Sequence, residues 1–216
     1  MKKYDVLIFD WDGTVMDSRA AIVECLKVAI SECDYAMPDD KALANLIGLG
    51  LQQAFERLYP DIGVDNIDRL SASFRQAFQR PGMRESVLFP KVRETLDVLK
   101  VDYQLAVATG KSRRGLDRDM RRAELESYFP ITRTADETFS KPNPTMLFEI
   151  VTDLDTQVDK CLVIGDTDYD LNMARNANMD VVAVACGVHD EARLLEAEPL
   201  ALLTDISMLP AWLTQG

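Results

Sequence analysis

The chain has 216 residues, which is enough for one sizeable hydrophobic core and a modest second subdomain. Its formal net charge of −12 would repel a nucleic-acid backbone, so nucleic acid is not expected as a partner. No apolar run approaches the roughly 18 residues that a membrane span requires, and the first apolar run is far too short for a signal peptide. We therefore expect no membrane association, a cytoplasmic location, and a monomer or a dimer.

The first element in chain order is a strand at residues 6–9. This continuous apolar run ends in a polar cluster, which is typical of a strand buried on both faces of a parallel sheet. The same pattern returns at residues 105–108, 161–164 and 181–184, with helical spacing at 144–154 and 169–177. The alternation predicts an α/β fold with a doubly wound parallel sheet, whose ligands collect at the carboxyl ends of the strands.

A helical segment interrupts this alternation directly after the first strand. Residues 17–86 show amphipathic patterns and no convincing strand. Helices are expected at 20–33, 41–46, 51–58 and 67–78, with turn signals such as Gly48-Leu49-Gly50 between them. The sequence therefore predicts a core domain of residues 1–16 and 87–216 and an inserted α-helical cap subdomain of residues 17–86.

Four cysteines are scattered along the chain without metal-ligand spacing: Cys25, Cys33, Cys161 and Cys186. In a chain of this size without an export signal, we expect them to be reduced and mostly buried.

Two carboxylates, Asp10 and Asp12, follow the first strand, and Gly13 permits a tight turn there. Carboxylates held close together repel each other unless a cation neutralises them, and Mg²⁺ with oxygen ligands would do so. An Asp-Gly pair can equally be an ordinary turn. A second acidic group, Asp166 and Asp170, follows the strand at 161–164, where the alternative is that Thr167 or Asp168 merely caps the next helix. Two acidic groups at one sheet edge favour a metal site.

Two further segments offer groups that could hold a phosphate. Thr109 and Gly110 supply a hydroxyl and a turn amide at a third strand end, although a simple loop would look the same. Lys141 precedes a helix, and Pro142 restricts its backbone, so a fixed ammonium could balance carboxylates and phosphate. Taken alone, Lys141 could also be a solvent-exposed lysine.

Together these four segments resemble, in this order, the motifs of the haloacid dehalogenase (HAD) superfamily of aspartate-nucleophile phosphatases. The run from Asp10 to Thr14 matches its D-x-D-G-T signature, and Thr109, Lys141 and the run from Gly165 to Asp170 match the other three motifs. A helical insertion after the first motif resembles the phosphoglycolate phosphatase-like branch, which has a small α-helical cap. The resemblance implies a HAD-like Rossmannoid core and a phosphoric monoester hydrolase that requires Mg²⁺ and acts on a small phosphorylated metabolite.

The resemblance also implies a role for each matching residue. Asp10 attacks phosphorus to give an aspartyl-phosphate, while Asp12 protonates the leaving alcohol and later deprotonates the hydrolytic water. The implied metal ligands are Asp10, the main-chain carbonyl of Asp12, and Asp166. Asp170 is implied to support these ligands without binding the metal itself. The implied phosphoryl-binding residues are Thr109, Gly110 and Lys141.

Other interpretations stay open at this stage. A phosphosugar mutase of the β-phosphoglucomutase type would carry the same acids, and a non-catalytic phosphometabolite-binding protein would keep the fold without turnover. Dehalogenation is disfavoured, because haloacid-hydrolysing relatives do not need an acid at Asp12. We expect Lys111, Arg113 and Arg114 on a solvated helix face, although they could steer an anionic substrate. His189, the only histidine, is expected in a loop or at a helix start.

Overall fold

The computed structural model describes residues 2–83 and 85–214. Its main sheet has six parallel strands in the order β5-β4-β1-β6-β7-β8. Their bounds are β1 (Val6–Phe9), β4 (Gln104–Thr109), β5 (Ile131–Thr134), β6 (Cys161–Gly165), β7 (Asp180–Val184) and β8 (Ala201–Leu203). The chain runs outward from β1 to β5 and then, on the other side, from β6 to β8. The strand order therefore reverses between β1 and β6, and the predicted doubly wound parallel sheet is confirmed.

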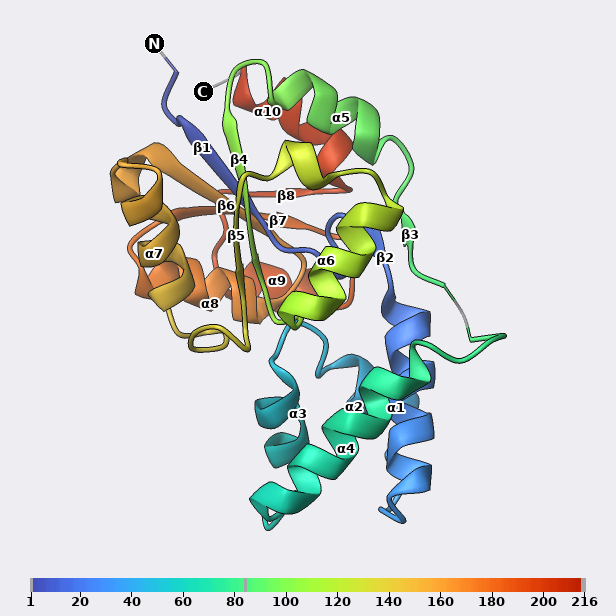
Figure 1. Cartoon of the computed structure of the whole chain (residues 1–216). Helices are drawn as coiled ribbons and strands as arrows, with labels where there is room; N and C mark the ends of the chain where they lie inside the picture. The colour runs from blue at the N-terminus through green and yellow to red at the C-terminus, as the bar shows by residue number, and fades with distance from the viewer. Residues whose placement is uncertain (1, 84, 215–216) are drawn as a thin grey trace.

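Helices cover both faces of this sheet (Figure 1). One face carries α5 (Val92–Leu99), α6 (Arg113–Arg122) and α10 (Leu209–Leu213), and the other carries α7 (Thr145–Asp153), α8 (Asp168–Asn176) and α9 (Glu191–Glu196). Along β1, Leu7 and Phe9 pack on the first face while Val6 and Ile8 pack on the second. Burial on both faces explains why the strand is a continuous apolar run rather than an alternating one.

Short helical turns fill several connections. These are η1 (Glu126–Tyr128), η2 (Val158–Lys160) and η3 (Ile206–Met208). Among the helices of residues 2–83 and 85–214, none has the length and apolar character needed to cross a membrane. The four cysteines are free, and three of them are buried while Cys186 is partly exposed.

Four helices form a separate layer beyond the carboxyl ends of the strands (Figure 1). They are α1 (Arg19–Glu32), α2 (Asp40–Ala44), α3 (Leu51–Leu58) and α4 (Val64–Ala77). Their apolar faces enclose a core of their own around Leu26, Ile30, Phe55 and Leu70. The four helices expected in the cap are thus present, although α4 begins three residues earlier than predicted. The domain boundaries at 16/17 and 86/87 stay a prediction.

Those predicted boundaries fall on two very short strands that the sequence pattern did not reveal. β2 (Met16–Asp17) pairs antiparallel with β3 (Val87–Leu88), so the two connections between the layers are bonded to each other. The expectation of no strand from residue 17 onward was wrong at Asp17. Two residues are too few to show the alternation that marks a strand.

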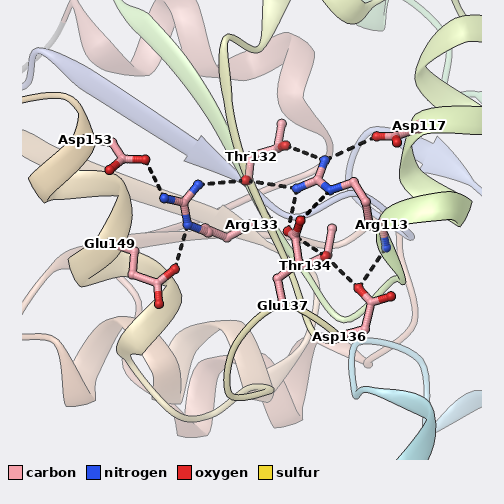
Figure 2. Close-up of polar contacts among 9 residues, drawn as sticks. All are labelled: Arg113, Asp117, Thr132, Arg133, Thr134, Asp136, Glu137, Glu149 and Asp153. Carbon is pink, nitrogen blue, oxygen red and sulfur yellow. Dashed lines mark hydrogen bonds and ion pairs between the residues drawn. The ribbon is translucent and has the colours of Figure 1, made fainter.

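The edge strand β5 was also missed, because three of its four side chains are polar and three are only partly buried. Figure 2 shows Arg133, on β5 itself, and Arg113, at the start of α6, each surrounded by acidic side chains. Arg113 pairs with Asp117 and Glu137 and donates to Thr132 Oγ1, whereas Arg133 pairs with Glu149 and Asp153. Charged residues at a sheet edge discourage pairing with another chain. Arg113 lies on the outer face of α6, as expected, and its charge is paired with Asp117 and Glu137.

Candidate active site

Three buried carboxylates meet where the strand order reverses. Asp10 follows β1, Asp166 follows the neighbouring β6, and Asp170 lies in the first turn of α8. Their exposed fractions are 2%, 0% and 0%, and one oxygen from each lies within 4.8 Å of the others. The two acidic groups predicted from separate strand ends are therefore brought together into one cluster.

The charge of this cluster is only partly balanced by protein groups. Burial, opposed by the charge of Lys141, raises the pKa of Asp10 to about 7. Burial and the charges of Asp10 and Asp170 raise the pKa of Asp166 well above its usual range. Ionised, the three acids and Lys141 would carry a net charge of −2, and Asp10 Oδ2 is buried without a hydrogen-bond partner among the described residues. A divalent cation with oxygen ligands, such as Mg²⁺, fits this cluster.

Lys141 joins two members of the cluster. Its Nζ donates to Asp10 Oδ1 at 2.6 Å and to Asp170 Oδ1 at 2.5 Å, and its side chain is fully buried. Burial alone would lower the pKa of Lys141, but the charges of Asp10 and Asp170 raise it above its usual range. The alternative of a solvent-exposed lysine is therefore excluded.

Asp166 is fixed by short contacts from two loops. Thr14 Oγ1 donates to its Oδ1 at 2.8 Å, and the main-chain amide of Val188 donates to its Oδ2 at 2.9 Å. Gly13 has a φ of +96°, and a Cβ added there would lie 2.2 Å from Asp166 Oδ2. A Cβ at Gly187 would lie 2.0 Å from the same oxygen. The glycine of the first motif is therefore required both by its backbone conformation and by the close approach of Asp166.

Asp170 has a structural role as well as its place in the cluster. Its Oδ2 accepts hydrogen bonds from Thr167 N at 3.1 Å and from Thr167 Oγ1 at 2.6 Å. Thr167 is the N-cap of α8, and the two residues form a reciprocal capping box. The N-capping alternative is thus correct for Thr167, while Asp170 uses its other oxygen for Lys141.

Asp12 lies apart from the acidic cluster and binds a second buried lysine. Lys111 Nζ donates to both carboxylate oxygens of Asp12, at 2.9 and 2.8 Å, and lies 3.2 Å from Asp119 Oδ2. The Lys111 side chain is only 8% exposed, so its predicted place on a solvated helix face was wrong. Asp119 was missed, because an acid two turns along a charged helix is normally a surface residue.

Thr109 and Gly110 lie beneath a loop of the cap. Thr109 ends β4, the neighbour of β1, and is 1% exposed. A Cβ added at Gly110 would lie 2.3 Å from the carbonyl oxygen of Gly48. Gly50 N also donates to Ser140 Oγ at 2.8 Å, one residue before Lys141. The loop 48–50 therefore rests directly on the predicted phosphoryl-binding turn.

A second contact joins the cap to the loop that carries Asp166. Tyr169 Oη donates to the carbonyl of Asn45 at 2.7 Å, and Arg193 bridges Asn45 Oδ1 and the carboxylate of Asp168. His189 lies in the loop before α9, as expected, and is buried, with its Nδ1 accepting from Asp168 N at 3.0 Å. Burial, with the charge of Arg193, lowers the pKa of His189 to about 4.

The cap and the core enclose a cavity of about 310 Å³ beside these groups. Asp12, Thr109 and Gly110 contribute to its core side. A small ester could therefore place its reacting atoms at the strand ends and its remaining atoms against the cap.

Comparison with known proteins agrees with this architecture. Residues 7–184 match the family model described as haloacid dehalogenase-like hydrolase. The chain is 33% identical to the "Probable phosphatase IndB" of Dickeya dadantii, over 94% of this chain and 90% of that protein. It is 28% identical to a phosphoglycolate phosphatase of Agrobacterium fabrum, over 94% and 89%. A hydrolase from Pseudomonas syringae superposes with a TM-score of 0.89 at 25% identity, covering 98% of each chain.

The chain belongs to the haloacid dehalogenase-like hydrolase family. The expected enzyme class, a phosphatase, is confirmed by the relatives that carry this name.

Proposed function

We propose that the protein is a Mg²⁺-dependent phosphatase that hydrolyses a small phosphate monoester through an aspartyl-phosphate on Asp10. The observation that carries this proposal is the environment of Asp10. One of its oxygens is held by Lys141, while the other is buried without a hydrogen-bond partner among residues 2–83 and 85–214, at the edge of the sheet where Asp166 and Thr109 also lie. Such a carboxylate is oriented for attack and has no competing hydrogen bond.

In the first step, an Asp10 oxygen forms a bond to phosphorus as the bond between phosphorus and the leaving oxygen breaks. Asp12 enters this step protonated, which requires its ion pair with Lys111 to loosen, and it gives that proton to the leaving oxygen. In the second step, water attacks phosphorus, Asp12 accepts the water proton, and the bond between Asp10 and phosphorus breaks. Lys111 Nζ lies 2.8 Å from an oxygen of the carboxylate that accepts this proton.

Thr109, Gly110 and Lys141 are proposed to bind the phosphoryl oxygens, which need compensation of charge as the group transfers. Asp10, Asp166 and the main-chain carbonyl of Asp12 would hold Mg²⁺, and Asp170 would fix Lys141 beside them. When bound, Mg²⁺ supplies further positive charge to the transferring oxygens.

Phosphate release from a panel of small phosphate esters tests the proposal, with Mg²⁺ or with EDTA. We expect release that requires Mg²⁺ and falls by about a thousandfold or more in Asp10→Asn, which keeps the shape of the side chain but removes the nucleophile. Acid quenching of a radiolabelled reaction should leave a base-labile phosphoryl group on the wild type. Release that persists in Asp10→Asn or in EDTA would contradict the mechanism.

The same assay separates the alternatives. Transfer of the phosphoryl group to another hydroxyl of a phosphosugar, without release, would favour a mutase. Ester binding with neither release nor transfer would favour a phosphometabolite-binding protein.

A further inference from the structure

The cavity between cap and core is larger than a two-carbon leaving group needs. Its 310 Å³ corresponds to about ten water-sized groups, at roughly 30 Å³ each. Glycolate and the scissile phosphoryl group together have about nine non-hydrogen atoms, which are covalently bonded and therefore occupy less space than nine separate waters, so such an ester would fill only part of the cavity. The cavity therefore suits a leaving group that is larger than two carbons.

The cap side of the cavity is apolar. Residues from α1, the α2–α3 loop and α4 form this wall, including Ile22, Leu26, Ile47, Leu49, Phe74 and Phe78. Phe78 also contacts the core domain across the cavity. Its ring centroid lies 4.9 Å from the Arg118 guanidinium carbon and 5.8 Å from Lys111 Nζ. An aromatic or branched hydrocarbon body would bury its surface against this wall.

The remaining lining is strongly basic, although the chain as a whole is acidic, with 36 acidic and 24 basic residues. Four arginines line the cavity: Arg75 of α4 and Arg114, Arg118 and Arg121 of α6. Asp12 is the one acidic residue of the lining, and Lys111 already neutralises it. Positive charge is therefore concentrated in the lining of this cavity.

Three of these arginines are not engaged by protein acids. Arg118 pairs with Asp119, and the adjacent Arg113, outside the cavity, is held by the acids of Figure 2. Within residues 2–83 and 85–214, no ion pair is formed by Arg75, Arg114 or Arg121. Their guanidinium groups are free to bind an oxyanion, for which the fork of an arginine is well suited.

We propose that the substrate of this site is a phosphate monoester whose leaving group has an apolar body and a second oxyanion, a carboxylate or a phosphate. The apolar body lies against the cap wall, and the second oxyanion is bound by Arg75, Arg114 and Arg121. This inference rests on the proposed function, because it assigns the scissile phosphate to the end of the cavity at Asp12 and Thr109.

Binding of non-hydrolysable phosphonates tests this assignment without requiring turnover. Isothermal titration calorimetry with Mg²⁺ would compare benzylphosphonate with 4-carboxybenzylphosphonate and with 1,4-xylylenediphosphonate. We expect at least one of the two doubly anionic probes to bind about tenfold or more tightly than benzylphosphonate, as charge-assisted hydrogen bonds to arginine predict. The order of the two probes identifies the preferred oxyanion.

Arginine variants locate the effect. Arg114→Gln with Arg121→Gln, and separately Arg75→Gln, should reduce the preference for the doubly anionic probe by about tenfold and leave benzylphosphonate binding within about twofold. The matched control is Arg122→Gln, which removes the same charge from α6 but pairs with Glu85 and does not line the cavity. This control should keep the full preference. Thermal melts would verify that all variants fold.

Equal affinity for the three probes would overturn the inference, as would a preference that survives removal of the arginines or failure to bind any probe. The outcome is separable from the proposed function. Release of phosphate from simple esters without a preference for the second oxyanion would overturn this inference alone. A preference in binding without phosphate release from any ester would support this inference and contradict the phosphatase mechanism.

Discussion

The raised pKa of Asp10 predicts how the stability of the metal-free protein depends on pH. Its pKa in the folded protein is about 7, compared with an ordinary value of 3.8. Between these values the folded state keeps a proton that the unfolded state has released, so stability falls as pH rises from about 4 to about 7. The difference between the two pKa values corresponds to about 4 kcal/mol.

Asp10→Asn isolates this contribution, because the amide has the same shape and does not titrate. The free energy of unfolding of the variant minus that of the wild type should grow with pH, by about 4 kcal/mol between pH 4 and pH 8. For a chain of this size that is a rise of roughly 8–16 °C in the difference of melting temperatures. Urea unfolding in EDTA at several pH values measures it directly.

Two controls keep the result specific. Asp61→Asn changes an exposed cap residue and should leave a difference from wild type that is flat across pH. Mg²⁺ should stabilise the wild type more at pH 8 than at pH 5, because metal binding requires ionised carboxylates and releases their protons. A difference between Asp10→Asn and wild type that is constant with pH, or that shrinks as pH rises, would refute this account of the cluster.

Three further outcomes follow from neighbouring residues. Lys111→Met removes the cation shared by two buried carboxylates, so the free energy of unfolding in urea should fall by about 3–5 kcal/mol, and adding Asp119→Asn should restore part of it. Gly110→Ala should displace the cap loop and lower kcat/KM for a small ester by about tenfold or more, whereas Gly63→Ala, whose Cβ would meet nothing within 4 Å, should not. His189→Gln should gain stability relative to the wild type by up to about 3 kcal/mol as pH falls from 6.5 to 4, because the fold keeps the wild-type histidine neutral. A difference in the free energy of unfolding between variant and wild type that does not change over this pH range would contradict this prediction.

The central strands could be predicted because burial on both faces leaves a continuous apolar run, as at residues 6–9 and 161–164. The ends of these strands then predicted where the acidic residues would meet, because parallel strands present their carboxyl ends at one edge of the sheet. The outer strands β5 and β8 escaped detection, because partial burial removes that signal. The hydrophobic pattern of a segment therefore predicts a strand only where packing requires apolar side chains along its whole length.

Burial of charged residues could not be predicted in the same way. Lys141 binds carboxylates that lie 131 and 29 residues away in sequence, and Lys111 binds one that lies 99 residues away. The restriction by Pro142 singled out Lys141 but did not show that it is fully buried, and nothing in the local sequence distinguishes Lys111 from an exposed lysine. Arg75 and Arg114 likewise line one cavity only because the cap is folded over the core, which depends on contacts between distant segments.

The two buried lysines explain how two aspartates separated by one residue can have different roles. Lys141, in the connection between β5 and α7, binds Asp10 together with Asp170 of α8. Lys111, in the connection between β4 and α6, binds Asp12 together with Asp119 of α6. Each carboxylate thus has its own cation, so a change of protonation at Asp12 does not remove the group that orients Asp10. The proposed nucleophile and the proposed proton carrier can then act in sequence within one small site, because each is held by a different lysine.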